Sequence, residues 1–373
     1  MRMICKRPIL EVDFNLNVIK GRMTRILFII IANLIALSCA KANDGVFRIN
    51  GNELVPIHNT DIKVSKEILS IKKISEKQVA VSVYYEFDNP GEGQLINVGF
   101  EARPPQEDEE PLADDTFKKV PANAPHPFMH NFTVSMNGNI LPFTNKVEYN
   151  QKYGSTKMYV YLFNADFVTG KNIIRHSYIC DFSENVSSFY EFSYVLDAAK
   201  RWAGGKIGDF TLIVDMGDFA SLGISETFFD NIADWTMVGN GKIIDFKKSM
   251  KDKEDYSPDS LMKCYIRQGM IVFHKTDFVP MSNLNIFCLD GICTITTENI
   301  NNDLFDARKY KDEFFCHIPF TDVKPKMKAK DEYSARVLRN IPFARRGYIF
   351  KDQSLQKFFE AMEWYMPDPN YRP

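Results

Sequence analysis

The sequence has few of the residues, and none of the local motifs, that mark common enzyme families. It holds only six histidines in 373 residues, and it contains no Gly-x-Ser-x-Gly, no His-Glu-x-x-His and no glycine-rich phosphate loop. The sequence therefore does not indicate a serine hydrolase, a zinc peptidase or a nucleotide-binding enzyme of the kinds that carry these motifs. A hydrolase built on two distant carboxylates stays open, because such residues leave no local pattern.

Residues that bind metals are equally sparse. His126 and His130 are close in sequence, but Pro127 between them disfavours a helix that would place both rings on one face. The acidic stretch 106–115 lacks the alternating carboxylates and the glycine turn of a calcium loop. We therefore predict loops for both segments, no metal site and no cofactor.

Long apolar runs are scarce, and the one near the N-terminus is too short to span a membrane. Lys20, Arg22 and Arg25 precede the apolar run 26–37. A membrane-spanning helix needs about 20 such residues. The pattern predicts a cleaved export signal over residues 1–42 and no transmembrane segment after it.

Two cleavage chemistries compete at the end of this signal. Ala40-Lys41-Ala42 is a small-residue site that would release Asn43, whereas Ala36-Leu37-Ser38-Cys39 is a loose lipobox that would make Cys39 lipid-bearing. The lipobox has a leucine where a small residue is usual, which favours ordinary cleavage. Met23 is an alternative start. We expect a secreted, periplasmic or outer-envelope protein.

The cysteines that follow the signal fit an exported protein. Cys288 and Cys293 flank Asp290-Gly291, a two-residue hairpin turn that would place the two cysteines opposite each other. Export favours a disulfide between them over two buried thiols. The pairing of three others stays open: Cys180, Cys264 and Cys316.

Short segments with strand-forming residues recur along the body, residues 43–320. One of them has apolar residues at every second position, as a strand with one buried face does: Val79, Val81, Val83, Tyr85 and Phe87. Asn137-Gly138 between two apolar runs predicts a hairpin, and Trp202 is expected to anchor a short turn. We predict a mainly β fold, with an antiparallel β-sandwich body and a small α-helical C-terminal module.

Three segments of the body resemble an exported bacterial domain family of unknown function. They match its strand end, its Trp-x-x-Gly turn and its late Phe-x-Pro segment: Phe87-Asp88-Asn89, Trp202 to Gly205 and Phe278-Val279-Pro280. This resemblance supplies no catalytic residue that could be carried over.

The C-terminal module is predicted over residues 324–373. Asp331 to Arg339 has the spacing of a helix, and Gly347 ends that segment. Asp352 is expected to cap a second helix from Gln353 to Trp364.

The order and spacing of residues in this module resemble the YARHG domain. Leu338-Arg339-Asn340, the segment 343–350 and Trp364-Tyr365-x-Pro367 follow its pattern. The five name-giving residues appear here as Phe-Ala-Arg-Arg-Gly, so Arg346 replaces the histidine, which argues against a role that needs a titrating imidazole. The resemblance implies an extracellular module of unknown function, common at the C-terminus of exported bacterial proteins.

Within this pattern, Gly347 supplies a helix stop at positive φ, and four apolar residues are expected to form a small core: Phe350, Leu355, Phe359 and Trp364. Arg339, Asn340 and Arg345 are the candidate ligand-binding residues. One interpretation has Asn340 and Arg345 hydrogen-bonding the chain reversal and Arg339 solvated. The other has all three forming a cationic cleft for a carboxylate, phosphate or glycan.

Net charge differs between body and module. The chain is at −2, but residues 324–373 carry 11 Lys/Arg against 6 Asp/Glu, or +5, and residues 43–323 are at −12. The module either docks on its own body or contacts an anionic surface. We predict an envelope protein with a non-enzymatic binding or scaffold role, whose module contacts a cell-wall polymer, an anionic surface or an envelope protein, but no nucleic acid. The alternative is an extracytoplasmic hydrolase with its active site in the body.

Overall fold

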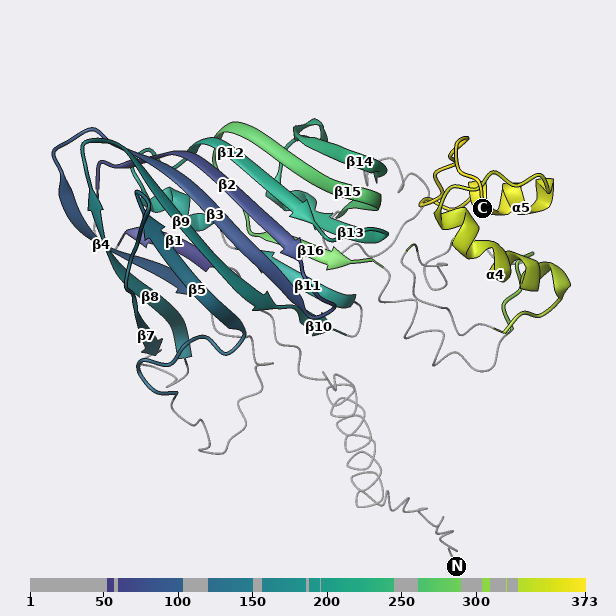
Figure 1. Cartoon of the computed structure of the whole chain (residues 1–373), viewed down its shortest axis with the longest axis horizontal. Coiled ribbons are helices and arrows are strands. Elements are labelled where there is room, and N and C mark those ends of the chain that lie inside the picture. The colour runs from purple at the N-terminus through teal and green to yellow at the C-terminus, as the bar shows by residue number, and fades with distance from the viewer. Residues whose placement is uncertain are drawn as a thin grey trace, which may run out of the picture. The chain divides into compact units, whose positions relative to one another are not determined.

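The computed structural model describes residues 52–56, 60–102, 120–149, 156–185, 188–194, 196–244, 261–289, 304–308, 320 and 328–373 (Figure 1). All of them belong to one compact unit, residues 45–373. The predicted export signal lies outside the described residues. Within the described part of the chain, no helix is long and apolar enough to cross a membrane.

Two β-sheets make up the body. The smaller has the order β1-β4-β8-β7, and all its pairs are antiparallel. Its strands are β1 (Asn52–Pro56), β4 (Gln94–Ala102), β7 (Thr144–Tyr149) and β8 (Thr156–Phe167).

The larger sheet has twelve strands in the order β10-β11-β16-β13-β15-β12-β2-β3-β9-β5-β6, with β14 paired to β15. They are β2 (Lys63–Lys73), β3 (Gln78–Asn89), β5 (Met129–Met136), β6 (Asn139–Ile140), β9 (Gly170–Asp181), β10 (Ser183–Asn185), β11 (Ser188–Tyr194), β12 (Ile207–Asp215), β13 (Ala220–Ser225), β14 (Trp235–Ile244), β15 (Leu261–Phe278) and β16 (Leu284–Cys288). Strands β2 and β12 pair in parallel, an arrangement that the sequence did not predict.

The two sheets pack face to face through aromatic side chains. Phe100 on β4 lies with its ring centroid 4.9 Å from that of Phe132 on β5 and 4.8 Å from that of His176 on β9. Phe87 on β3 meets Phe167 on β8 edge to face at 5.5 Å. One continuous buried cluster therefore joins both sheets, and the prediction of a mainly antiparallel sandwich is confirmed.

Local sequence signals account for several elements of this body. The five alternating apolar residues predicted for β3 are all buried. Asn137 and Gly138 both have positive φ, 49° and 89°, and connect β5 to β6 as the predicted hairpin turn. Trp202 follows a short 3-10 helix (Asp197–Arg201) and packs against Phe87 at 4.5 Å, as expected for a turn anchor.

Strand β15 changes its partner along its length. Its first part pairs with β13 and its last part with β12, while β14 pairs with its residues 263–273. Gly239 on β14 and Gly269 on β15 are paired, and both have positive φ. A Cβ on either residue would lie about 2 Å from a carbonyl oxygen of the opposite strand. Glycine is therefore required at both positions, and Gly269 lies two residues after Arg267.

Two helices form the C-terminal module. Helix α4 (Glu332–Arg345) begins after Asp331, whose side chain accepts the amide of Ser334, and it continues through Pro342 beyond its predicted end. Helix α5 (Gln353–Glu360) is capped by Asp352, as predicted, but ends four residues before the predicted Trp364. The helical spacing of the apolar residues misled this prediction, because Met362 and Trp364 are buried from turns rather than from a helix.

Candidate functional site

The module has a hydrophobic core of its own, which extends onto the body. Phe350 stacks on Phe359 with centroids 5.0 Å apart, and Phe359 lies 6.2 Å from Trp364. Leu355 completes the group of four buried residues expected from the sequence. Tyr265 of strand β15 belongs to the same buried cluster. The module core is therefore completed by a residue of the body.

Gly347 occupies a position that tolerates no side chain. Its φ is +88°, and a Cβ there would lie 2.5 Å from the carbonyl oxygen of Met366 and 2.8 Å from a guanidinium nitrogen of Arg267. Its own carbonyl oxygen accepts the amide of Asp368 at 2.8 Å. The glycine thus ends helix α4 and also lets the C-terminal segment pass close to β15.

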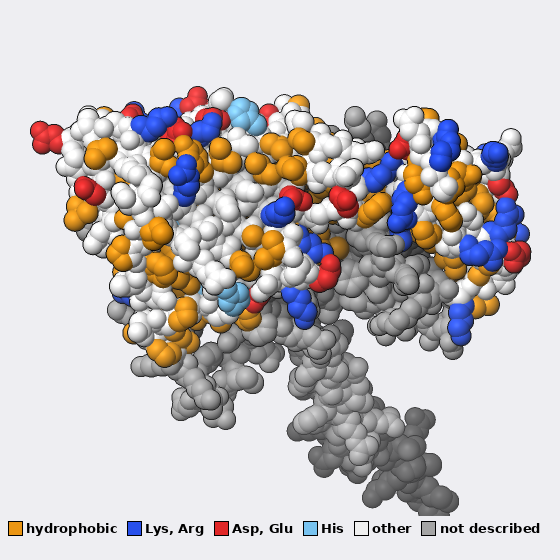
Figure 2. All heavy atoms as spheres, viewed as in Figure 1, with side chains coloured by type: hydrophobic (Ala, Val, Ile, Leu, Met, Phe, Trp, Pro, Cys, Tyr) orange, Lys and Arg blue, Asp and Glu red, His pale blue; other side chains and the backbone are white. Residues whose placement is uncertain are grey.

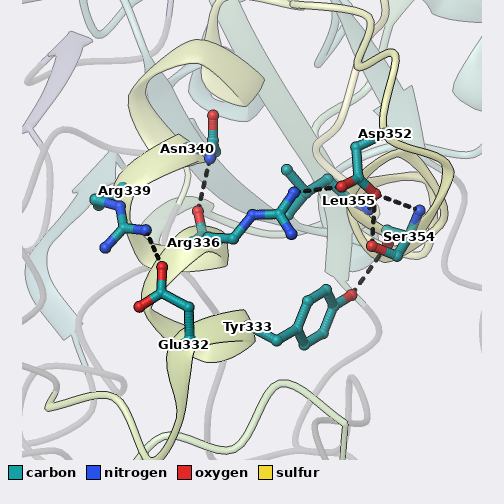
Figure 3. Close-up of polar contacts among 8 residues, drawn as sticks. All are labelled: Glu332, Tyr333, Arg336, Arg339, Asn340, Asp352, Ser354 and Leu355. Carbon is teal, nitrogen blue, oxygen red and sulfur yellow. Dashed lines mark hydrogen bonds and ion pairs between the residues drawn. The ribbon is translucent and has the colours of Figure 1, made fainter.

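The three candidate ligand-binding residues all lie on helix α4, and Figure 3 draws two of them, Arg339 and Asn340. Arg339 is exposed and forms an ion pair of 2.6 Å with Glu332, which lies near the start of the same helix. Asn340 donates to the backbone carbonyl of Arg336 at 2.7 Å. Arg345 is buried. Arg345 lies six positions after Arg339 in the helix. At about 100° per residue, their side chains lie about 120° apart around the helix axis.

An arginine that sequence analysis did not single out links the two helices. Arg336 forms an ion pair with Asp352, the N-cap of α5 (Figure 3). Asp352 also accepts hydrogen bonds from the hydroxyl and amide of Ser354, and together these contacts hold the pKa of its carboxyl well below the usual range. Tyr333 adds a hydrogen bond of 3.0 Å to the backbone carbonyl of Ser354.

A second polar contact joins the module to strand β15. Lys263, Tyr265 and Arg267 alternate along the strand, so their side chains share one face. Lys263 pairs with Glu363 at 2.9 Å, and the Tyr265 hydroxyl donates to the same carboxylate at 3.1 Å. Two carboxylate contacts from neighbouring positions thus hold Glu363 on the strand.

Arg267 makes the most buried part of this contact. Its guanidinium donates to the backbone carbonyl of Met366, and it lies 3.6 Å from a carboxylate oxygen of Asp368. Burial lowers the pKa of Arg267, while Asp368 opposes that shift. Lys242 on the adjacent strand β14 donates to the carbonyl of Tyr365 at 3.2 Å, and burial lowers its pKa as well.

We call Lys242, Lys263 and Arg267 the basic strip, and residues 363–368 the strap. The body is acidic and the module basic in net charge, yet at this contact the body supplies the cations and the module the carboxylates. The strip could not be recognised from the sequence, because strand residues spaced two apart give no indication of a partner some 100 residues away.

A separate polar group lies between the two sheets of the body. Glu67 on β2 faces Tyr85 on β3, which hydrogen-bonds to it and to Tyr194 on β11. Burial raises the pKa of Glu67 to about 8, and the hydrogen bond from Tyr85 opposes that shift. The carboxyl is therefore protonated at neutral pH.

His176 lies in the same interior. Its ring contacts Phe100 and Tyr85 at centroid distances of 4.8 and 5.7 Å. Neither ring nitrogen has a hydrogen-bond partner among the described residues. Burial lowers the pKa of His176 to about 3, so the imidazole is neutral at physiological pH.

The other candidates from the sequence have structural surroundings. His126 is buried with its ring 4.9 Å from that of Tyr159, and His130 pairs with Asp181 at 3.1 Å. In the described part of the chain, no three His, Cys, Asp or Glu side chains are grouped to hold a metal ion. Cys293, the proposed partner of Cys288, lies outside the described residues, as do Cys316 and the acidic stretch 106–115.

Comparison with known proteins identifies the module. The family model of the YARHG domain matches residues 321–372. No curated protein matches the chain.

Several solved structures have low similarity to this chain. A Legionella pneumophila protein provisionally named a nutrient binding protein is 16% identical, with 88% of this chain and 94% of that chain covered and a TM-score of 0.49. Leukotriene A4 hydrolase from Saccharomyces cerevisiae is 8% identical over 57% of this chain and 29% of its own, with a TM-score of 0.24. An M1 zinc metallopeptidase from Deinococcus radiodurans is 9% identical over 62% and 43%, with a TM-score of 0.27. The chain thus spans less than half of either enzyme, and similarity at this level transfers no function.

The resemblance inferred from the sequence is confirmed by the family match: the C-terminal segment of this chain is a YARHG domain, of a kind typical of extracellular proteins.

Proposed function

We propose that this chain is an extracellular binding protein of the cell envelope, in which the YARHG domain contacts an anionic cell-wall polymer and the β-sandwich is its scaffold. The domain type supports an extracellular place. The distribution of charge over the domain supports an anionic ligand.

The observation that carries this proposal is the use of carboxylates at the contact with β15. Glu363 and Asp368 face the basic strip, and Asp352 faces Arg336 inside the module. Three of the six acidic side chains in residues 324–373 are thereby engaged, two of them by cations of the body, which leaves a basic excess at the surface of the domain. Figure 2 shows Lys and Arg side chains gathered on the visible face of the module.

Three exposed cations stand out on this surface: Arg339, Lys351 and Lys357. Among the described residues, no carboxylate lies within ion-pair distance of Lys351 or Lys357, and Arg339 has only the exposed Glu332. Cations near a polyanionic surface contribute about 1 kcal/mol each at low salt. Together, these three cations can support salt-sensitive binding.

A sedimentation assay with isolated peptidoglycan sacculi tests the proposal on the chain from residue 43 onward. Replacing Arg339, Lys351 and Lys357 by Gln should weaken binding at low salt at least about tenfold. The matched control replaces three exposed body lysines, Lys72, Lys146 and Lys171, by Gln and should leave binding unchanged. Equal losses in both variants, or no binding by the wild type, would contradict the proposal.

The interior of the body does not favour the hydrolase alternative. Glu67 and His176 combine shifted pKa values with hydrogen-bonding capacity, which is typical of catalytic groups. Each side chain is only 2% exposed, however, so a substrate cannot reach either without opening the sandwich.

A further inference from the structure

The contact between the strap and the basic strip has the form of a peptide bound to a protein surface. The strap follows helix α5 and its turns, and residues 365–368 adopt neither helix nor strand. It offers two carboxylates, from Glu363 and Asp368, and two backbone carbonyls, from Tyr365 and Met366. Each of these four acceptors meets a cation of the strip.

The strip has more capacity than the strap uses. It carries three cations, whereas the strap supplies two carboxylates. Lys242 donates to a backbone carbonyl, and the carboxylate that acts on its charge, Glu363, is ion-paired with Lys263. The Nε atom of Arg267 is buried and has no hydrogen-bond partner in the described part of the chain. Since a guanidinium has five N–H donors, a ligand with better-placed acceptors would satisfy Arg267 more fully.

The strip lies on two paired strands of the body. Lys263 and Arg267 are spaced along β15, and Lys242 is paired in register with Tyr265 from β14. The pair Gly239 and Gly269 lies beside Arg267 and brings the two strands into close approach. The pairing of the two strands therefore fixes the spacing of the residues that carry the cations, which lowers the cost of binding.

We propose that the basic strip is a binding site for acidic peptides, and that the strap occupies it as an intramolecular ligand. The partner is a peptide segment with two carboxylates about five residues apart and accessible backbone carbonyls between them. The site is on the body and separate from the exposed basic residues of the YARHG domain, so it does not rest on the proposed function. Binding of such a peptide displaces the strap and takes Trp364 and Tyr365, which are buried in the module core, out of that core.

A tethered ligand competes at an effective concentration in the millimolar range, so the test weakens the tether first. The chain from residue 43 onward, with Glu363→Gln and Asp368→Asn, keeps the strip intact but removes the carboxylates of the strap. A fluorescein-labelled peptide with the sequence of residues 361–370 is then titrated, and its fluorescence anisotropy is measured. We expect it to bind the double variant at least about tenfold more tightly than the wild-type chain.

Matched changes show which groups bind the peptide. Adding Lys263→Gln to the double variant should weaken binding about tenfold, whereas adding Lys72→Gln on β2 should not. A peptide with both carboxylates replaced by amides should not bind. Equal affinity for the wild-type and double-variant chains, or indifference to Lys263→Gln, would overturn the proposal. Labelled polyphosphate binding as tightly as the peptide would also overturn it, in favour of a general anion surface.

A second measurement holds even where the double variant folds poorly. In the wild-type chain, the amide of Asp368 bonds to Gly347 and that of Tyr365 bonds to Met362. Unlabelled peptide at millimolar concentration should accelerate hydrogen exchange at these two amides severalfold while leaving helix α4 protected. Unchanged exchange at both amides would refute displacement of the strap.

Discussion

The carbonyl oxygen of Gly347 accepts the amide hydrogen of Asp368 at 2.8 Å, across a turn where no side chain fits. Gly347, the glycine of the name-giving YARHG pattern, thus joins the end of helix α4 to the strap that contacts strand β15. One position serves the local structure of the module and also its contact with the body.

Replacing Gly347 by Ala should therefore destabilise the module more than a strained backbone alone explains. A Cβ at Gly347 costs about 1–2 kcal/mol for φ of +88°, and its approach to the carbonyl of Met366 adds to that cost. Gly138→Ala is the matched control, because Gly138 has φ of +89° but nothing within 4 Å of a Cβ. Urea unfolding should show a loss about twice as large for Gly347→Ala. Equal losses would mean that the strap moves aside freely.

The sequence predicted the elements that depend on local signals. The alternation of apolar residues predicted the buried face of β3. Asn137-Gly138 predicted the hairpin, and Asp352 predicted the start of α5. Each follows from residues within a few positions of one another. The YARHG pattern also identified the C-terminal module from the sequence alone.

Contacts between distant strands could not be predicted in this way. Alternation shows that one face of a strand is buried but not which strand lies next to it, so the parallel pairing of β2 with β12 had no signal. The same holds for Arg267 and Asp368, which are about 100 residues apart. Glu67 left a usable signal, because it occupies an inward position of β2 in line with Leu69 and Ile71. An acidic residue at such a position indicates a buried carboxyl.

The buried carboxyl of Glu67 should make the body less stable as pH rises. Its pKa is raised from 4.5 to about 8 in the fold, so the folded state holds its proton more tightly than the unfolded chain does. Its contribution is complete below pH 4.5 and is lost between pH 4.5 and 8, by about 4–5 kcal/mol at 1.36 kcal/mol per pKa unit. Below about pH 6.5 this loss is offset by the gain from the imidazole of His176, so the wild-type decline should be seen between about pH 6.5 and 8. In Glu67→Gln the decline in that window should vanish when stability is measured by urea unfolding.

A control for the loss of a carboxylate is Glu92→Gln, because Glu92 is exposed on the turn after β3. Its pH profile should follow the wild type. If Glu67→Gln kept the wild-type decline, another group would cause it. The inference that the buried Glu67 carboxyl is protonated in the fold would then be contradicted.

The neutral imidazole of His176 should act at the opposite end of the pH scale. Its pKa is lowered from 6.5 to about 3, so its contribution is complete above pH 6.5 and is lost as pH falls toward 3. The contribution of Glu67 to the free energy of unfolding falls as pH rises above 4.5, whereas that of His176 rises up to pH 6.5. The two effects therefore cancel between about pH 4.5 and 6.5 and leave a plateau in stability there. His176→Phe should remove the acid-side loss, whatever its effect on absolute stability. An acid limb with the wild-type slope in this variant would assign acid unfolding to other groups.

The ion pair of Lys263 with Glu363 should contribute measurably to the contact of module and body, unlike pairs at the open surface. Both side chains are about one quarter exposed, and the Tyr265 hydroxyl donates to the same carboxylate. A double-mutant cycle with Lys263→Gln and Glu363→Gln should give a coupling of about 1 kcal/mol that persists in 0.5 M salt. Lys146 and Glu148, 3.3 Å apart and about half exposed, are the matched pair, and their coupling should be near zero at that salt. If the two cycles gave equal couplings, the strap would be held by its apolar neighbours alone, and the carboxylates of the strap would have no part in choosing what binds the basic strip.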